Sequence, residues 1–267
     1  ALTAVLNFNR DLAVSLFLRL CNAEDSRNAE NPLLGTSTVD TFLYYALPTH
    51  YQELAPTLQR MIHSDIPSVI RVGSRQACLI SMIAEEASPS LVNECLEGTV
   101  NHRLSAAEVF VANLHLPQHR ELCENQLNQL FHDPAQEVQD EAARCFFQLK
   151  ENDELSNYTN LIQAFITSPA FENHYNDLIH ALEKTTAQLP GITCLVCEEF
   201  INLFGSTTAD IRTGIAADAS AVSELLIRIY RQSRTDATLQ SRCLDIIDRM
   251  AEAGSYGINR ALDPYDR

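Results

Sequence analysis

A pair of amphipathic segments between residues 122 and 149 constrains the fold of this chain more than any other feature. His132-Asp133-Pro134 separates the two segments, with Asp133 suited to the N-cap of the second helix and Pro134 to its first position. Gln136 completes a capping-box pattern. Because apolar residues recur in both segments at helical spacing, the pattern predicts two antiparallel helices that pack together. The predicted stripes are Cys123, Leu127, Leu130 and Phe131 in the first helix, and Val138, Ala142, Cys145, Phe146 and Leu149 in the second.

The same pattern occurs earlier in the chain. Asp65 takes the place of Asp133, and the two residues are 68 positions apart (133 − 65 = 68). The segment between the two hairpins contains two more amphipathic stretches, residues 89–98 and 104–114, so half of that interval corresponds to one helix pair. The stripes of this earlier hairpin are Leu54, Leu58, Met61 and Ile62, then Ile70, Ser74, Ala77 and Cys78.

A helix pair that recurs at a fixed interval indicates a stacked repeat fold, because one pair cannot bury both of its faces alone. We therefore expect an all-α fold, an α-solenoid of antiparallel helix pairs that spans residues 1–267 as one domain and is most regular over 51–149. The chain begins at Ala1 and enters an apolar stretch at once. This is expected either of a fragment of a longer chain or of a protein whose initiator Met has been removed.

Outside the hairpins, the helical periodicity continues. We expect one helix over 5–20 and another that is capped by Thr38 or Asp40 and ended by Pro48. Of the two rings of Tyr44 and Tyr45, one should lie in the core. The residues from 205 to 218 are expected to form a loop. Further helical stripes lie within 161–166, 175–182, 192–204, 222–229 and 239–250, and Gly254 suits a C-cap.

Composition excludes several classes of function. With 46% apolar and 20% charged residues, the chain is expected to fold rather than stay disordered. A net charge of −16 opposes binding to phosphate backbones, so nucleic acid is not an expected partner. No apolar run approaches the length of a membrane span, and we expect no membrane association. Most of the eight cysteines fall on apolar stripes, which indicates a reducing, cytoplasmic compartment.

Two groups of residues resemble metal or redox motifs. Cys194-x-x-Cys197 is half of a typical zinc site, but it lies inside the apolar run 192–204, and we expect its thiols to pack in the core. His115, His119 and Cys123 would gather three ligands on a continuous helix, which Pro117 interrupts.

The sequence contains no phosphate-binding loop, nucleophile elbow or dinucleotide-binding loop. We therefore expect no catalytic, cofactor-binding or metal-binding residues, and a protein that is not an enzyme. The alternative is a helical-repeat enzyme or metal protein that uses His115, His119 and the cysteines.

Repeat proteins commonly bind other proteins along the face made by the second helices of successive pairs. Residues off the apolar stripes of those helices are the candidates for partner binding, and the cations among them stand out in a chain of net charge −16. These candidates are Arg71, Arg75, Asn101, His102 and Arg103. The alternative is that Arg71 bridges neighbouring repeats and that Arg103 pairs with a local carboxylate.

The hairpins resemble HEAT repeats. The resemblance rests on His132-Asp133-Pro134 followed by Val138 and Ala142-Ala143, and on Asp65, Ile70 and Arg71 in the earlier copy. In that family, the turn Asp and an Arg that follows the Val position often form a ladder between repeats. Arg71 fits this pattern, whereas Gln139 stands at the Arg position of the later hairpin.

A larger resemblance covers most of the chain. Several stretches are similar to the C-terminal helical-repeat regions of large bacterial STAND-type NTPases, some of which act in antiviral defence. The resemblance implies a region that senses a foreign protein, with the nucleotide site and the effector upstream. These stretches are Gln76-Ala77-Cys78-Leu79, Ser168-Pro169-Ala170-Phe171-Glu172, Asp177-Leu178-Ile179-His180-Ala181-Leu182-Glu183 and Cys243-Leu244-Asp245-Ile246-Ile247-Asp248-Arg249-Met250.

Overall fold

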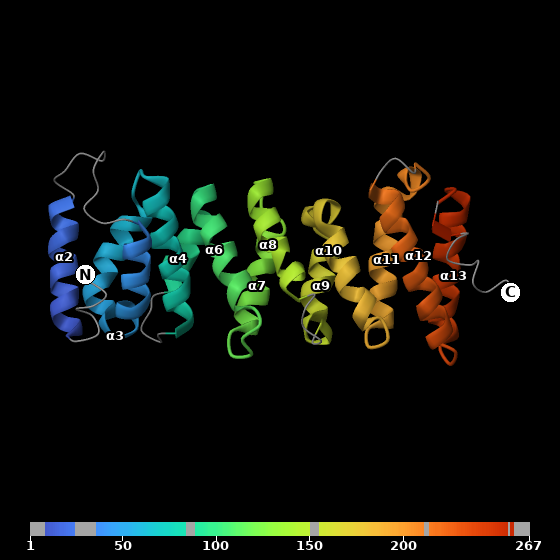
Figure 1. Cartoon of the computed structure of the whole chain (residues 1–267), viewed down its shortest axis with the longest axis horizontal. Coiled ribbons are helices and arrows are strands. Elements are labelled where there is room, and N and C mark those ends of the chain that lie inside the picture. The colour runs from blue at the N-terminus through green and yellow to red at the C-terminus, as the bar shows by residue number, and fades with distance from the viewer. Residues whose placement is uncertain are drawn as a thin grey trace. The chain divides into compact units, whose positions relative to one another are not determined.

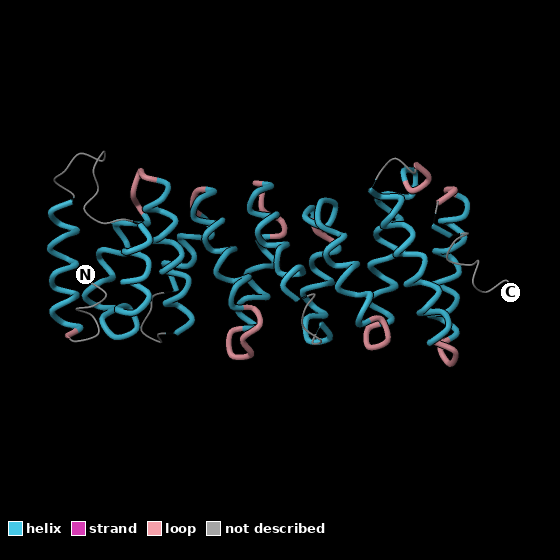
Figure 2. The backbone as a smooth tube through the Cα atoms, viewed as in Figure 1, coloured by secondary structure: helices cyan, strands magenta, loops and turns pink. Residues whose placement is uncertain are grey.

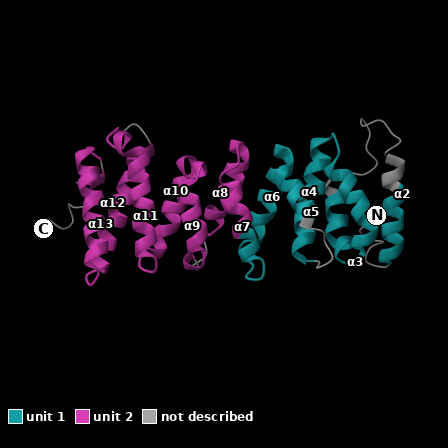
Figure 3. Ribbon diagram, turned by 180° about the vertical axis from the view of Figure 1, so that it is seen from behind, with its two compact units in different colours: residues 1–123 teal, residues 124–267 magenta. Residues whose placement is uncertain are grey.

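The computed structural model describes residues 9–24, 36–83, 89–149, 155–210, 214–255 and 257–258. Within these ranges the chain forms twelve α-helices and two short 3-10 helices and has no strand, so the predicted all-α class is confirmed (Figure 1, Figure 2). The chain divides into two compact units, residues 1–123 and residues 124–267 (Figure 3).

In its described residues, the first unit contains five complete helices and the first residues of a sixth, α7. Helix α3 contacts α2 and α4, while α4 also contacts α5 and α6. The predicted stripes of the earlier hairpin lie in its core, apart from the partly exposed Met61. The helices are α2 (Arg10–Glu24), α3 (Thr36–Ile62), α4 (Pro67–Ile83), α5 (Pro89–Glu97), α6 (Val100–Asn113) and α7 (Arg120–Leu130).

Helix α3 differs from its prediction. It begins at Thr36, so Thr38 and Asp40 lie inside the helix rather than at its cap. It also continues past Pro48, although the backbone leaves the helical conformation at His50 (φ −128°, ψ 31°). Proline lacks the N–H that would bond to the preceding turn and crowds that turn with its ring, whereas the departure from helical geometry follows Pro48. The predicted break is therefore present, two residues later.

The rings of Tyr44 and Tyr45 are both on the surface, with 51% and 53% of each residue exposed. The prediction that one of them lies in the core is wrong. The rings contact each other edge to face, with centroids 5.2 Å apart. The neighbouring positions Phe42, Leu43, Ala46 and Leu47 supply the buried face of this part of the helix.

The second unit contains the remaining helices in two layers. Helix α10 contacts both α8 and α12, and α11 contacts both α9 and α13, so alternate helices are neighbours (Figure 1). Helix α12 begins at Gly214, so the predicted loop 205–218 is shorter than expected. The helices are α8 (Gln136–Leu149), α9 (Thr159–Ile166), α10 (Pro169–Thr185), α11 (Pro190–Phe204), α12 (Gly214–Gln232) and α13 (Ala237–Glu252), with 3-10 turns η1 (Leu155–Tyr158) and η2 (Gly205–Thr207).

The helices predicted between residues 122 and 149 are α7 and α8, and all nine residues of the predicted stripes are buried. The cap between them differs in detail. Asp133 accepts a hydrogen bond from the Ala135 N–H at 2.8 Å, and the Ala135 carbonyl accepts the first backbone bonds of α8. The helix begins at Gln136, so Pro134 precedes it instead of occupying its first position. Asp133 thus shapes the turn rather than capping the helix directly.

A similar difference occurs before α4. Asp65 is exposed, and the Ser64 hydroxyl accepts from the Ile66 N–H at 3.2 Å. Serine therefore takes the role that we predicted for Asp65. At the other end of the chain, Ala253 is the C-cap of α13, and Gly254 follows it in the left-handed turn conformation (φ +71°) that glycine favours.

Candidate functional site: a charged cluster on helices α3, α4 and α6

Four charged side chains of the first unit meet on the surface of three neighbouring helices. Arg75 of α4 donates from Nη1 to Asp40 Oδ2 of α3 at 3.0 Å and from Nη2 to Glu108 Oε2 of α6 at 2.6 Å. Arg71, one turn earlier on α4, donates to the other oxygen of Glu108. We call Asp40, Arg71, Arg75 and Glu108 the charged cluster. It connects α3, α4 and α6 through side chains alone.

A buried amide holds one end of the charged cluster in place. Gln76 is 2% exposed, and its Nε2 donates to Asp40 Oδ1 at 2.7 Å and to the Asp40 backbone oxygen at 3.2 Å. Each carboxylate oxygen of Asp40 therefore has its own donor, one from Gln76 and one from Arg75. This arrangement fixes the carboxylate that orients the Arg75 guanidinium.

The charged cluster is partly open to solvent. The side chains of Arg71 and Arg75 are 40% and 35% exposed, whereas those of Asp40 and Glu108 are 26% and 21% exposed. Burial lowers the pKa of Arg75, but the hydrogen bonds and negative charges of Glu108 and Asp40 outweigh it and raise that pKa overall. A guanidinium has five N–H donors, and the contact of Arg71 with Glu108 engages Nη2. The arginines can thus present further donors on the surface while their charges stay paired.

His102 does not lie where the sequence placed it. Helix α6 begins at Val100, four residues before the stripe we predicted, so His102 is inside its first turn and only 7% exposed. Its Nδ1 accepts from the Thr99 N–H at 3.1 Å and lies 2.8 Å from the Thr99 hydroxyl. Nε2, 2.8 Å from the Ile62 carbonyl, is therefore the protonated nitrogen and donates to the last residue of α3. The prediction that His102 projects toward a partner is wrong.

Thr99-x-x-His102 is the local signal that could have identified this role. A capping box places a hydroxyl residue at the N-cap and a side chain three residues later that bonds back to the N-cap amide. That side chain is usually Glu or Gln, and here it is a histidine. A search restricted to Glu and Gln misses it.

The two other predicted residues lie on the same turn. Asn101 is partly exposed, and Arg103 donates to the backbone carbonyl of Gly98, just beyond the end of α5. A cation near a helix C-terminus is favoured by the partial negative charge of the terminal carbonyls. The Gly98 carbonyl is thus one partner of Arg103, and the pairing of Arg103 with a local carboxylate stays a prediction. Of the five predicted residues, the structure joins Arg71 and Arg75 through Glu108.

Polar contacts of a similar kind recur in the second unit. His174 Nε2 of α10 lies 2.8 Å from Asp140 Oδ1 of α8, and the Tyr175 hydroxyl donates to Asp218 of α12 at 2.9 Å. Burial and the neighbouring Asp218 raise the pKa of Tyr175, which keeps the phenol protonated as a donor. The His174–Asp140 contact spans 34 residues of sequence, compared with 35 for Arg75–Asp40 and 33 for Arg75–Glu108. One contact of the second unit thus has the predicted interval of 34 residues, whereas Tyr175–Asp218 spans 43 residues and Arg242–Glu198 spans 44.

The residues considered for a metal or redox site lie in two different parts of the chain. His115 is exposed and His119 partly exposed, and both lie in the turn between α6 and α7 that includes Pro117. Cys194 and Cys197 are buried on α11, as predicted for core thiols. Across the parts of the chain that the structure describes, no three His, Cys, Asp or Glu side chains are arranged to hold a metal ion.

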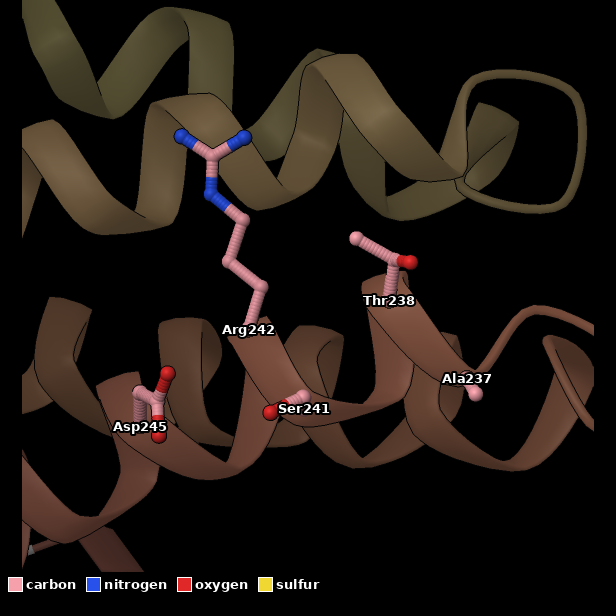
Figure 4. A pocket seen from close by; sticks show the side chains of 5 residues that line it. All are labelled: Ala237, Thr238, Ser241, Arg242 and Asp245. Atoms are coloured by element: carbon pink, nitrogen blue, oxygen red, sulfur yellow. The ribbon is translucent and has the colours of Figure 1, made fainter.

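A shallow hollow of about 510 Å³ lies on α13, lined by Ala237, Thr238, Ser241, Arg242 and Asp245 (Figure 4). All five residues belong to one helix, and Arg242 already pairs with Glu198 of α11. The hollow therefore lacks the convergent polar groups of a small-molecule site.

No helix within the described ranges has the length and apolar character needed to cross a membrane. Comparison with known proteins gives no match to a protein-family model, to a curated protein sequence or to a solved structure.

Proposed function

We propose that the chain is a non-catalytic, protein-binding repeat module, a sensor or scaffold region in which HEAT-like helix pairs stack as an α-solenoid. The observation that carries the proposal is the recurring polar contact between one helix and its counterpart in the next pair. It spans 43 residues for Tyr175–Asp218 and 44 for Arg242–Glu198, and 33 to 37 residues for the contacts that precede them in the chain. The interval in those preceding contacts is shorter than the roughly 40 to 47 residues usual for HEAT repeats. Short first helices account for it, since α5 has nine residues and α9 has eight.

The charged cluster is the part of the surface that we assign to partner binding. Arg71 and Arg75 are held in fixed orientations by Glu108 and Asp40, so little side-chain freedom is lost when they bind. In a chain of net charge −16, they favour an acidic or polar ridge on a protein partner. His102 is withdrawn from this surface because it is buried and bonded at both ring nitrogens.

A narrower proposal is that the module is the target-sensing part of a bacterial STAND-type defence NTPase. It rests on the resemblance of the stretches around residues 76–79, 168–172, 177–183 and 243–250. Several of these residues are buried, including Phe171, Leu178, Cys243, Ile246 and Met250, so the resemblance concerns packing. The seven described cysteines are all free and buried, which supports a reducing, cytoplasmic compartment.

The proposal is tested by affinity capture with the purified chain, followed by mass spectrometry. Arg71→Gln removes the more exposed cation and leaves Arg75 with both of its carboxylates. Arg144→Gln is a matched control, because Arg144 is a 64% exposed arginine that pairs with Glu141 on α8. We expect one partner to be captured by the wild type and the control but not by Arg71→Gln, at equal melting temperatures.

Two results would contradict this proposal. A partner that binds the wild type and Arg71→Gln equally would exclude the charged cluster as the binding surface. Stoichiometric zinc or iron in the purified chain would favour the metal-protein alternative over a binding module.

A further inference from the structure

Cys194 of α11 and Cys243 of α13 face each other between two neighbouring helices. Their Sγ atoms are 3.9 Å apart, within hydrogen-bonding range for sulfur. Both residues are fully buried, and both are free thiols. Two thiols in direct contact differ from an isolated core cysteine, because each sulfur has a second sulfur with which it can react.

The surroundings give the two thiols different roles. The hydrogen bond from Cys243 lowers the pKa of Cys194; burial opposes this effect, and the positive charge of Arg242 adds to it. The same hydrogen bond, together with burial, raises the pKa of Cys243. Arg242 extends from α13 toward the neighbouring helix and donates from Nε to Glu198 Oε2 at 2.8 Å, which holds it in place (Figure 4). Cys194 is therefore the more readily ionised thiol, and Cys243 is the donor.

Other buried cysteines provide a comparison within the same chain. Burial raises the pKa of Cys145 and that of Cys197, which lies one turn from Cys194 on the same helix. In the first unit, a hydrogen bond from Cys78 lowers the pKa of Cys95 and the negative charge of Glu94 raises it, as the charge of Glu198 raises the pKa of Cys194. Cys194 thus combines a thiol donor with a nearby cation, a combination that favours the thiolate.

We propose that Cys194 and Cys243 form a redox-modification site, in which a hydroperoxide converts the two thiols to a disulfide that links α11 to α13. This proposal does not depend on the proposed binding function.

The reaction has two balanced steps. The Cys194 thiolate attacks one peroxide oxygen, the O–O bond breaks, and Cys194 becomes a sulfenic acid. The other oxygen takes up the proton that the Cys194 thiol released on ionising and leaves as water or an alcohol. The Cys243 sulfur then attacks the Cys194 sulfur, the S–O bond breaks, and the hydroxyl leaves as water with the Cys243 proton. Two electrons pass from the thiols to the peroxide. Closure needs the sulfurs to approach by about 1.9 Å, from 3.9 Å to the usual disulfide length of about 2.05 Å.

The disulfide would join residues 49 positions apart. A cross-link over a loop of this length restricts the unfolded chain more than the folded one. We therefore expect the melting temperature of the oxidised protein to rise by at least about 2 °C. Reduction should reverse the change.

The test uses the whole chain, reduced and then treated with hydrogen peroxide. Intact mass should fall by two hydrogen atoms, and a non-reducing peptide map should join the peptides of Cys194 and Cys243. Cys197→Ser should behave like the wild type, whereas Cys194→Ser should not form the link. In Cys243→Ser, a sulfenic-acid probe such as dimedone should label Cys194. Circular dichroism checks that all variants keep the helical fold.

A link between Cys194 and Cys243 that forms in the wild type and in Cys197→Ser supports the proposal. An unchanged thiol count after peroxide treatment, or a cross-link that joins other cysteines instead, would overturn it. A Cys145→Ser control keeps the comparison specific, since Cys145 is equally buried and carries no thiol partner in this reaction.

Discussion

Polar contacts between helices occur in both units of the chain, but a long row of aromatic rings is described only in the second. In the first unit, side-chain contacts between helices run through the charged cluster and through the buried imidazole of His102. In the second unit, seven aromatic rings follow one another through the core, with neighbouring centroids 4.4 to 6.3 Å apart. These rings belong to Phe131, Phe146, Phe165, Phe171, Tyr175, Phe200 and Phe204.

This difference indicates how each unit responds to change. Aromatic packing depends on buried area and close contact, so it is insensitive to salt and costly to truncate. Paired charges near the surface contribute less, because water and salt screen them. The stability of the second unit should therefore depend on the volume of its buried side chains. The stabilisation that the charged cluster provides should depend on ionic strength and on which side chains pair within it.

Phe165→Ala should have the largest effect. The Phe165 ring lies between those of Phe131, Phe146 and Phe171, and the residue is fully buried, so truncation leaves a cavity. We expect the free energy of unfolding to fall by about 3 to 5 kcal/mol, measured by chemical denaturation. Phe147→Ala is the matched control at a residue that is 57% exposed, and it should cost much less. Equal losses for both variants would contradict the importance of the aromatic row.

His102→Ala tests the buried polar contact of the first unit. It removes the donor to the Ile62 carbonyl, which is a buried contact, and the acceptor for the N–H of Thr99, which is an exposed residue. We expect a loss of about 2 to 3 kcal/mol in the same measurement. His115→Ala, at an exposed position in a turn, should change stability little. An equally small effect at both positions would show that His102 is dispensable.

The periodicity of the sequence predicted the helices well because burial of an apolar stripe is a local property that spacing reveals. Every predicted stripe residue of α7 and α8 is buried, and the interval of 34 residues reappears in the His174–Asp140 contact. The predicted helix caps were wrong for a different reason. The choice between Asp133 and Ala135 as the helix start depends on backbone geometry that propensity does not specify.

The candidate site was predicted only in part. Arg71 and Arg75 were identified, but Asp40, a partner of Arg75, precedes it by 35 residues, and a single sequence gives no signal for such a distant pair. His102 was misplaced because the search for stripes counted apolar residues alone. A buried polar residue does not contribute to hydrophobic periodicity. The capping box that begins at Thr99 could nevertheless have revealed His102.

Arg75→Ala addresses the charged cluster. Since Arg75 is about one-third exposed, we expect a loss of only about 1 kcal/mol despite its two carboxylate partners. Arg144→Ala, which removes a more exposed pair with Glu141 of the same helix, should cost about 0.5 kcal/mol or less. Repeating both denaturation series in high salt should reduce the cost of Arg75→Ala. A cost that is independent of salt would show that packing of the arginine stem, rather than its charge, stabilises this unit.

Tyr44→Ala should lower the free energy of unfolding the least. It tests whether the burial of aromatic rings, rather than their mere presence, makes the two units respond differently to truncation. Tyr44 contacts Tyr45 edge to face, yet both residues are about half exposed, so truncation should cost about 0.5 kcal/mol or less. Phe42→Ala is the matched control on the same helix, because the ring of Phe42 is fully buried and stacks on Phe17 with centroids 4.4 Å apart. A loss at Tyr44 as large as that at Phe42 would mean that another surface covers the tyrosines in solution. The melting temperature would then depend on protein concentration, because self-association is linked to folding. If the melting temperature stays constant, the exposed rings add little to folding, and the contrast between the units follows from what each one buries.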